Sequence, residues 1–210
     1  MLKILLIFAD PIEASETLAL FPFSACDNFY TYCTEHLHLD VLVLEKWGYE
    51  GVLQALTPPP SGYNLWINLG FAGATNPNIP LLTTYTITNV KELTKKTFVA
   101  REFMVTPISG LPQAQLTTVK SPYREGFHNN LQLVDMEGFF VAQQAFLSAS
   151  PCSMIKVTSD YTTQKGNVFL NKNKIRLSQK LAQAFLRIHS SLVHEIKPAL
   201  STDFITLQRN

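Results

Sequence analysis

The stretch that decides the fold is residues 2–13, LKILLIFADPIE. It opens with a nearly continuous apolar run, which is typical of a strand buried on both faces within a parallel sheet. Asp10 then supplies an N-cap, Pro11 fits the first helical position, and Glu13 stands where a capping box places its acidic partner. The sequence therefore predicts a buried strand that leads directly into a helix.

The rest of the chain continues this alternation of strands and helices. Apolar or β-branched runs predict strands at 39–44, 64–69, 81–90, 97–106, 114–119 and 154–158. Helical patterns cover 50–56, 136–148 and 174–196; the last of these is amphipathic, and Pro198 is expected to end it. Alternating elements of these two kinds indicate a layered α/β fold, and 210 residues suit a single domain over 1–210.

Composition excludes several classes of protein. A hydrophobic content of 46% and a charged content of 16% indicate a globular protein rather than a disordered one. The net charge is +1, so no basic surplus points to a nucleic acid or to an anionic membrane. The apolar start is shorter than the ~20 residues that a membrane-spanning helix needs, and no cleavage site of small residues follows it.

The cysteines and histidines suggest neither a disulfide framework nor a metal site. Cys26, Cys33 and Cys152 are odd in number and widely spaced. The predicted strand would point His36 and His38 to opposite faces. We therefore expect no metal and no organic cofactor, and the cytoplasm is the expected location.

Three acidic residues lie at predicted strand ends or helix starts: Glu13, Glu137 and Asp160. A glycine-rich turn, 70–73, occupies a fourth such position. Ligands of open α/β sheets bind beyond the carboxyl ends of the strands. Each acid also has a simpler explanation, as a capping-box partner, as a helix-dipole partner or as a turn residue. Residues and spacing alone thus indicate an α/β domain with a polar site.

Four segments, taken in order, resemble the nucleoside phosphorylase superfamily: KILLIFADPIEA, INLGFAGA, LVDMEGFFVAQQA and KVTSDY. They run from residue 3 to residue 161, and the similarity is greatest to the methylthioadenosine/S-adenosylhomocysteine nucleosidases and the futalosine hydrolases. This resemblance implies a three-layer αβα sandwich around a central mixed, largely parallel twisted sheet. It also implies a purine nucleoside as the small-molecule partner, and a homodimer.

The resemblance assigns a role to each matching residue. Glu13 would activate the attacking water, and Asp160 would donate a proton to purine N7, with Ser159 orienting it. Glu137 would bind the ribose hydroxyls, and Met136 would pack against the ribose. These roles suit the chemistry, because the purine leaves well only when protonated and the sugar becomes oxocarbenium-like as the bond breaks.

Two residues depart from the nucleosidase pattern. In the glycine-rich turn that ends at Gly73, Phe71 replaces a small hydroxyl residue, and Lys156 replaces an arginine, which keeps the charge but loses the planar fork. Both family positions lie near the attacking water. These departures and the compact chain favour futalosine or aminodeoxyfutalosine hydrolysis, in menaquinone biosynthesis, over methylthioadenosine/S-adenosylhomocysteine hydrolysis as the main prediction.

A loop around residues 121–130 is expected to reach the purine. Phe127 or Tyr123 could stack on the base, His128 is a candidate contact, and Ser121-Pro122 could lie beside it. A phosphorylase remains an alternative, but Arg101 is the first arginine of the chain, and related phosphorylases hold phosphate with earlier ones. A degenerate nucleoside-binding protein is a further alternative.

Overall fold

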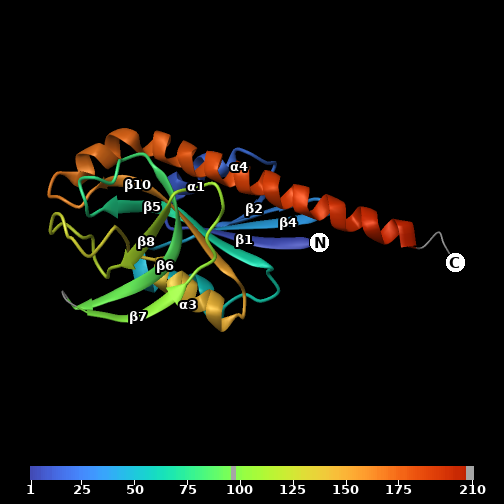
Figure 1. Cartoon of the computed structure of the whole chain (residues 1–210), viewed down its shortest axis with the longest axis horizontal. Coiled ribbons are helices and arrows are strands. Elements are labelled where there is room, and N and C mark those ends of the chain that lie inside the picture. The colour runs from blue at the N-terminus through green and yellow to red at the C-terminus, as the bar shows by residue number, and fades with distance from the viewer. Residues whose placement is uncertain (96–97, 207–210) are drawn as a thin grey trace.

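The computed structural model describes residues 1–95 and 98–206 (Figure 1). In chain order its elements are β1 (Leu2–Phe8), α1 (Pro11–Leu18), β2 (Ser24–Cys26), β3 (Phe29–Cys33), β4 (Leu37–Val43), α2 (Gly48–Leu56), β5 (Leu65–Ala74), β6 (Thr84–Lys95), β7 (Phe98–Met104), β8 (Gln113–Thr118), β9 (Leu133–Asp135), α3 (Gly138–Leu147), β10 (Cys152–Tyr161) and α4 (Gly166–Thr206).

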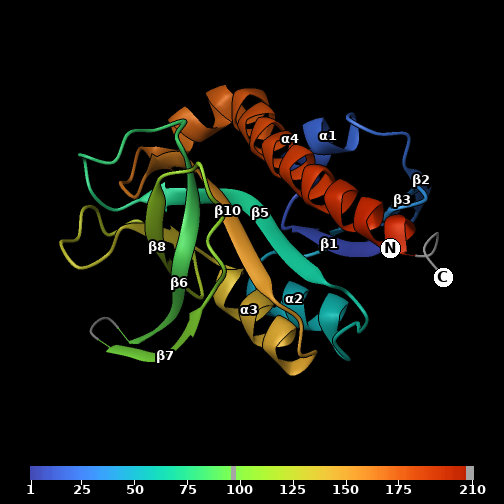
Figure 2. The same ribbon diagram turned by 45° about the vertical axis from the view of Figure 1, so that its right-hand side comes forward.

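The strands form one mixed sheet that partly closes on itself. Its order is β10-β6-β8-β9-β5-β1-β4-β3-β2, and β5 also pairs with β10, so that β5, β10, β6, β8 and β9 make a ring (Figure 2). Five pairings of the described residues are parallel and five are antiparallel. Register shifts in β10 and β6 mark irregularities of the kind that bend strands. The α/β class and the mixed sheet are confirmed, but the sheet is not largely parallel, and the ring of strands departs from the predicted three-layer αβα sandwich.

Helices cover two faces of the sheet, and each face has its own hydrophobic core. Side chains from α2 and α3 join one cluster, around Trp66 and Phe139. Side chains from α1 and α4 join the other, around Phe8 and Phe185. The apolar run of β1 contributes to both clusters in alternation, because successive side chains of a strand point to opposite faces. This explains why β1 has no polar face.

Several boundaries differ from the sequence-based prediction. The hairpin of β2 and β3 and the short β9 were not predicted, since each strand has only three to five residues. Helix α4 begins earlier than predicted, at Gly166, and runs past Pro198 to Thr206, with its last turns extending beyond the strands (Figure 1). A proline removes one helical hydrogen bond, and here the helix continues through it.

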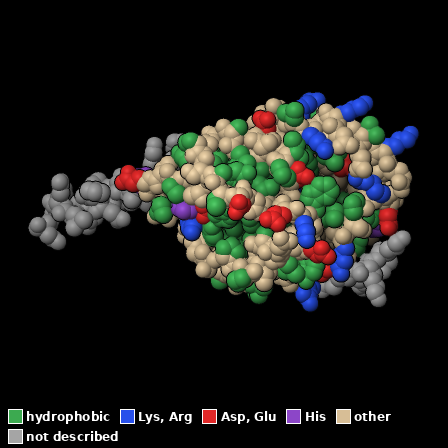
Figure 3. Space-filling view, turned by 180° about the vertical axis from the view of Figure 1, so that it is seen from behind, with side chains coloured by type: hydrophobic (Ala, Val, Ile, Leu, Met, Phe, Trp, Pro, Cys, Tyr) green, Lys and Arg blue, Asp and Glu red, His purple; other side chains and the backbone are tan. Residues whose placement is uncertain are grey.

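Charge and hydrophobicity are unevenly spread over the surface. On the face shown in Figure 3, most Lys and Arg side chains lie toward the right-hand side, with acidic side chains among them, and hydrophobic side chains are exposed further left. In the described part of the chain, no helix is both long and apolar enough to span a membrane.

Candidate active site

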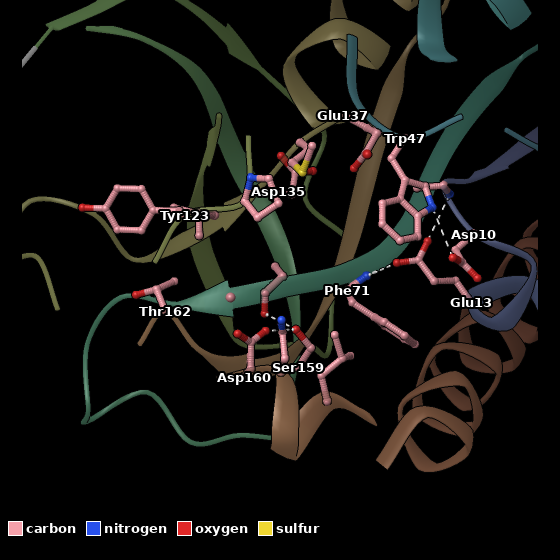
Figure 4. A pocket seen from close by; sticks show the side chains of 18 of the residues that line it. Asp10, Glu13, Trp47, Phe71, Tyr123, Asp135, Glu137, Ser159, Asp160 and Thr162 are labelled. Carbon is pink, nitrogen blue, oxygen red and sulfur yellow. Dashed lines mark hydrogen bonds between the residues drawn. The ribbon is translucent and has the colours of Figure 1, made fainter. Parts of the chain in front are cut away.

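The pocket that holds the predicted acids lies where β1, β5 and β10 end and α3 begins. Its volume is about 380 Å³, and Glu13, Glu137 and Asp160 all line it. Figure 4 shows Glu13 and Glu137 on one side and Asp160 on the other, with β5 running between them. The strand-end positions inferred from the sequence therefore do meet in one cavity.

Two backbone N–H groups hold the Glu13 carboxylate in place. One carboxylate oxygen accepts a hydrogen bond from the Ala9 N–H at 3.0 Å, and the other accepts one from the Phe71 N–H at 2.7 Å. A Cβ at Gly70 would lie 3.1 Å from the Glu13 carboxylate, so glycine leaves this carboxylate more room than a larger residue would. Asp10 caps α1 alone, through the Ile12 N–H. Glu13 therefore points into the pocket rather than completing a capping box.

Burial raises the pKa of Glu13 to about 8, although the Lys156 ammonium and the Phe71 N–H act in the opposite direction. The ordinary value is 4.5. Between these two pH values the folded protein holds a proton that the unfolded chain has released, so this residue makes stability fall as pH rises.

We therefore expect the melting temperature of Glu13→Gln, relative to wild type, to rise steadily from pH 5 to pH 8, because glutamine carries no such proton. Differential scanning calorimetry across this range measures the trend. Glu50→Gln, at an exposed position of α2, is the matched control and should show no trend. A constant difference for Glu13→Gln would contradict the raised pKa.

Glu137 is the N-cap residue of α3, but its side chain makes no capping hydrogen bond. The first N–H groups of α3 bond instead to Asp135, at 2.9 Å, and to the Thr118 hydroxyl, at 2.8 Å. The Glu137 carboxylate accepts a 2.6 Å hydrogen bond from the Gly48 N–H. Burial raises its pKa, with the negative charge of Asp135 as a second cause. The helix dipole alone therefore does not account for the position of Glu137, because its carboxylate is held by Gly48.

A buried ion pair lies next to Glu13 and Glu137. The Lys156 Nζ lies 2.9 Å from Asp135 Oδ2, and both side chains are 1% exposed. Burial alone would lower the pKa of Lys156, but the charges of Asp135, Glu13 and Glu137 raise it above its ordinary value. Lys156 therefore sits behind the pocket wall as a fixed cation. Asp135 was not among the predicted site residues; its only signal in the sequence is an acid placed directly before the Met-Glu pair.

Asp160 is held by two partners. Its Oδ1 accepts a 2.6 Å hydrogen bond from the Ser159 hydroxyl, in the place that the resemblance implied. Its Oδ2 lies 2.8 Å from the Arg124 guanidinium, which also contacts Asn167 on α4. A Cβ at Gly166 would lie 2.4 Å from the same Oδ2, so glycine is required there. Sequence reasoning did not identify Arg124.

The remaining predicted residues divide into two groups. Met136, Gly73 and Phe71 line the pocket, whereas Phe127 and His128 are not among its lining residues. Phe127 is 51% exposed and packs edge-on against Tyr161, and the His128 ring accepts a hydrogen bond from the Asn130 N–H. The loop meets the pocket through Pro122, Tyr123 and Arg124 instead.

Trp47 is a lining residue that the sequence did not reveal. Its side chain lies near Glu13 in Figure 4, and its indole N–H donates to Asp10 Oδ2 at 3.1 Å. Within residues 1–95 and 98–206, no group of three or more His, Cys, Asp or Glu side chains is arranged to hold a metal ion.

A solved nucleosidase is closely similar to this chain. The MTAN of Chlamydia trachomatis is 68% identical, with 91% of this chain and 99% of that chain covered and a TM-score of 0.87. The chain belongs to the nucleosidases of the nucleoside phosphorylase superfamily. It is therefore an N-glycosyl hydrolase of purine nucleosides. No family model and no curated protein matches the chain.

More distant structures share the fold. The 5′-methylthioadenosine nucleosidase of Arabidopsis thaliana is 16% identical, over 90% of this chain and 95% of that one, with a TM-score of 0.75. A futalosine hydrolase of Helicobacter pylori is 14% identical, over 93% of this chain and 100% of that one, with a TM-score of 0.73. Both support the nucleoside phosphorylase-like α/β fold.

The predicted preference for futalosine or aminodeoxyfutalosine is wrong. The enzyme at 68% identity is a methylthioadenosine nucleosidase, whereas the futalosine hydrolase is only 14% identical. The structure explains why the two departures misled. Phe71 donates a hydrogen bond to Glu13 through its backbone N–H, which any residue but proline supplies. Lys156 still places a positive charge next to the acidic side chains.

Proposed function

We propose that this nucleosidase hydrolyses 5′-methylthioadenosine (MTA) to adenine and a free sugar. The observation that carries the proposal is the 68% identity to an MTAN that has been solved with MTA and with adenine. The pocket supports it, because the three predicted carboxylates line a cavity of about 380 Å³, a volume within the range of small-molecule sites.

Glu13 is the general base in this proposal. Its two carboxylate oxygens are fixed by the Ala9 and Phe71 N–H groups, so the carboxylate is positioned before a water arrives. The raised pKa of about 8 makes the Glu13 carboxylate a stronger base than an ordinary glutamate, and the unprotonated form that takes the proton from water grows as pH rises toward 8. Removing the proton as the sugar cation forms gives the water its nucleophilic character.

Glu137 and Met136 bind the ribose. The Gly48 N–H fixes Glu137 at 2.6 Å, and the side chain lies in the wall beside Glu13. Negative charge at this place stabilises an oxocarbenium-like sugar more than the neutral ground state, which is what lowers the barrier. Asp135 lines the pocket and pairs with Lys156 behind it, so the negative charge of Asp135 is balanced locally.

Asp160 is the proton donor to purine N7, and Ser159 orients it. With Ser159 on Oδ1, the oxygen left for the purine is Oδ2, which Arg124 also contacts. The purine and Arg124 therefore compete for one oxygen. The segment that carries Arg124 is anchored on both sides, by the Val119 N–H to the Asp135 carbonyl and by the Gly126 N–H to the Thr162 carbonyl. Arg124 can leave Asp160 without those anchors breaking.

We expect Arg124→Gln to bind adenine more tightly than wild type does, by about tenfold, or 1.4 kcal/mol, because no guanidinium has to be displaced first. Titration calorimetry with adenine measures this. Lys165→Gln, directly before α4 and absent from the pocket lining, is the control. Weaker or unchanged adenine binding by Arg124→Gln would show that Arg124 does not compete with the base.

The function is tested by incubating the protein with MTA in phosphate-free buffer and identifying the products by chromatography. We expect adenine and free 5-methylthioribose, with S-adenosylhomocysteine as the second substrate to try. Recovery of a sugar 1-phosphate, or a strict need for phosphate, would instead support the phosphorylase alternative. An inactive protein that still binds adenine would support a nucleoside-binding role.

We also propose that the enzyme is a homodimer. A run of aromatic contacts joins Tyr49, Phe140, Phe139, Phe103 and Phe146 across α2, α3 and β7. Its two ends, Tyr49 and Phe146, are 46% and 70% exposed, and this connected aromatic cluster offers a partner chain an apolar surface to pack on. Light scattering after size exclusion should give twice the chain mass, and Phe146→Lys should halve it. A monomeric wild type would exclude this interface.

The proposed location of this enzyme is the cytoplasm.

A further inference from the structure

Three polar side chains outside the pocket form a hydrogen-bonded chain on β3 and β4. Cys33 and His38 are register partners in this antiparallel pair. The Cys33 Sγ lies 3.2 Å from His38 Nδ1, and His38 Nε2 lies 2.8 Å from Asp40 Oδ2. A thiol, an imidazole and a carboxylate linked in this order are the parts of an activated cysteine nucleophile.

Asp40 fixes the direction of this chain. Its carboxylate is buried, and it also accepts hydrogen bonds from the Thr31 hydroxyl at 2.8 Å and the Tyr63 hydroxyl at 2.7 Å. Burial, together with Asp40 itself, raises the pKa of Tyr63, so this phenol remains a donor. A carboxylate with two hydroxyl donors accepts the His38 Nε2–H as its third. The His38 Nδ1 lone pair then faces the Cys33 S–H.

The accessibility of these groups suits a reagent from solution. Cys33 is exposed, His38 is 21% exposed, and Asp40 is covered. The three groups follow one another in a line, and they are not arranged to hold a metal ion. His38 is the second residue of β4, whereas the pocket lies beyond the other end of that strand, about 17 Å away at 3.3 Å per residue. Cys33, His38 and Asp40 therefore take no part in the nucleosidase reaction.

We propose that Cys33 is a nucleophilic thiol and a site of modification by low-molecular-weight disulfides. In the exchange, His38 Nδ1 takes the Cys33 proton, and the thiolate attacks one sulfur of the disulfide. A new S–S bond forms to Cys33 while the old one breaks, and the leaving thiolate takes the proton from His38. Cys33–SH and RSSR thus become Cys33–S–SR and RSH, with no other oxidant.

The other two cysteines make the test internal to one protein. Cys26 is also exposed, at the far end of the hairpin, and among the described residues its thiol has no hydrogen-bond partner. Cys152 lies partly buried in β10, where burial raises its thiol pKa to about 12, so an increase in its reaction reports loss of structure. Native protein is treated with oxidised glutathione, and separately with iodoacetamide, and the modification of each cysteine is followed by peptide mass spectrometry.

We expect Cys33 to react at least about tenfold faster than Cys26 with both reagents. In His38→Gln the Cys33 rate should fall to within about twofold of Cys26, while Cys152 stays unmodified and so shows that the fold is intact. Asp40→Asn should lower the Cys33 rate less than His38→Gln does. Equal rates for Cys33 and Cys26 in wild type, or an advantage of Cys33 that survives His38→Gln, would overturn the proposal. MTA hydrolysis does not enter this test, so it stands or fails independently of the proposed function.

Discussion

Asp160→Asn is expected to lower the single-turnover rate of MTA hydrolysis by about 10²–10⁴-fold, since this is what proton transfer typically contributes. Asparagine has nearly the same shape, and its carbonyl oxygen can still accept from the Ser159 hydroxyl 2.6 Å away. Its amide can donate a hydrogen bond to N7, but it cannot transfer a proton. The affinity for adenine should therefore stay within about tenfold of wild type, a change of no more than about 1.4 kcal/mol.

The pair of measurements distinguishes chemistry from binding. Calorimetry gives the adenine affinity and rapid quench gives the rate, both on the same variant. Asp10→Asn is the matched control: Asp10 is another carboxylate in the pocket lining, but it caps α1, and asparagine caps a helix equally well. If affinity and rate of Asp160→Asn fall together by one modest factor, Asp160 is a binding or structural residue rather than the proton donor.

Glu13→Gln is expected to lower turnover by about 10²-fold or more, because an amide cannot take the proton of the attacking water. Glutamine can keep one of the two backbone hydrogen bonds that hold the side chain, to Ala9 or to Phe71. Initial-rate measurements at saturating MTA give the effect, and circular dichroism confirms that the variant is folded.

The control for this position lies on the same helix. Glu16 is three residues further along α1 and is absent from the pocket lining, so Glu16→Gln should retain its turnover. Near-normal turnover of Glu13→Gln would leave the residue with a purely structural task, as the acceptor of two buried N–H groups.

The sequence determined the layout of the fold where the signal is local. The apolar run of β1 and the capping residues after it identify the first strand and helix, because burial on both faces and a helix start both depend on neighbouring residues. The positions of Glu13, Glu137 and Asp160 at the ends of elements were enough to predict that these acids meet at one edge of the sheet, where they line one pocket. Short strands such as β9 carry too few residues for a pattern to emerge.

Tertiary structure alone decided which side chains meet. The pairing of Lys156 with Asp135, the contact of Arg124 with Asp160, and the alignment of Cys33 with His38 all depend on strand register or on a loop that folds back over the sheet. Closure of β5 and β10 into a ring likewise depends on bends in long strands rather than on composition. Hydrophobic periodicity is blind to such contacts, because it records which face of an element is buried and not what lies opposite it.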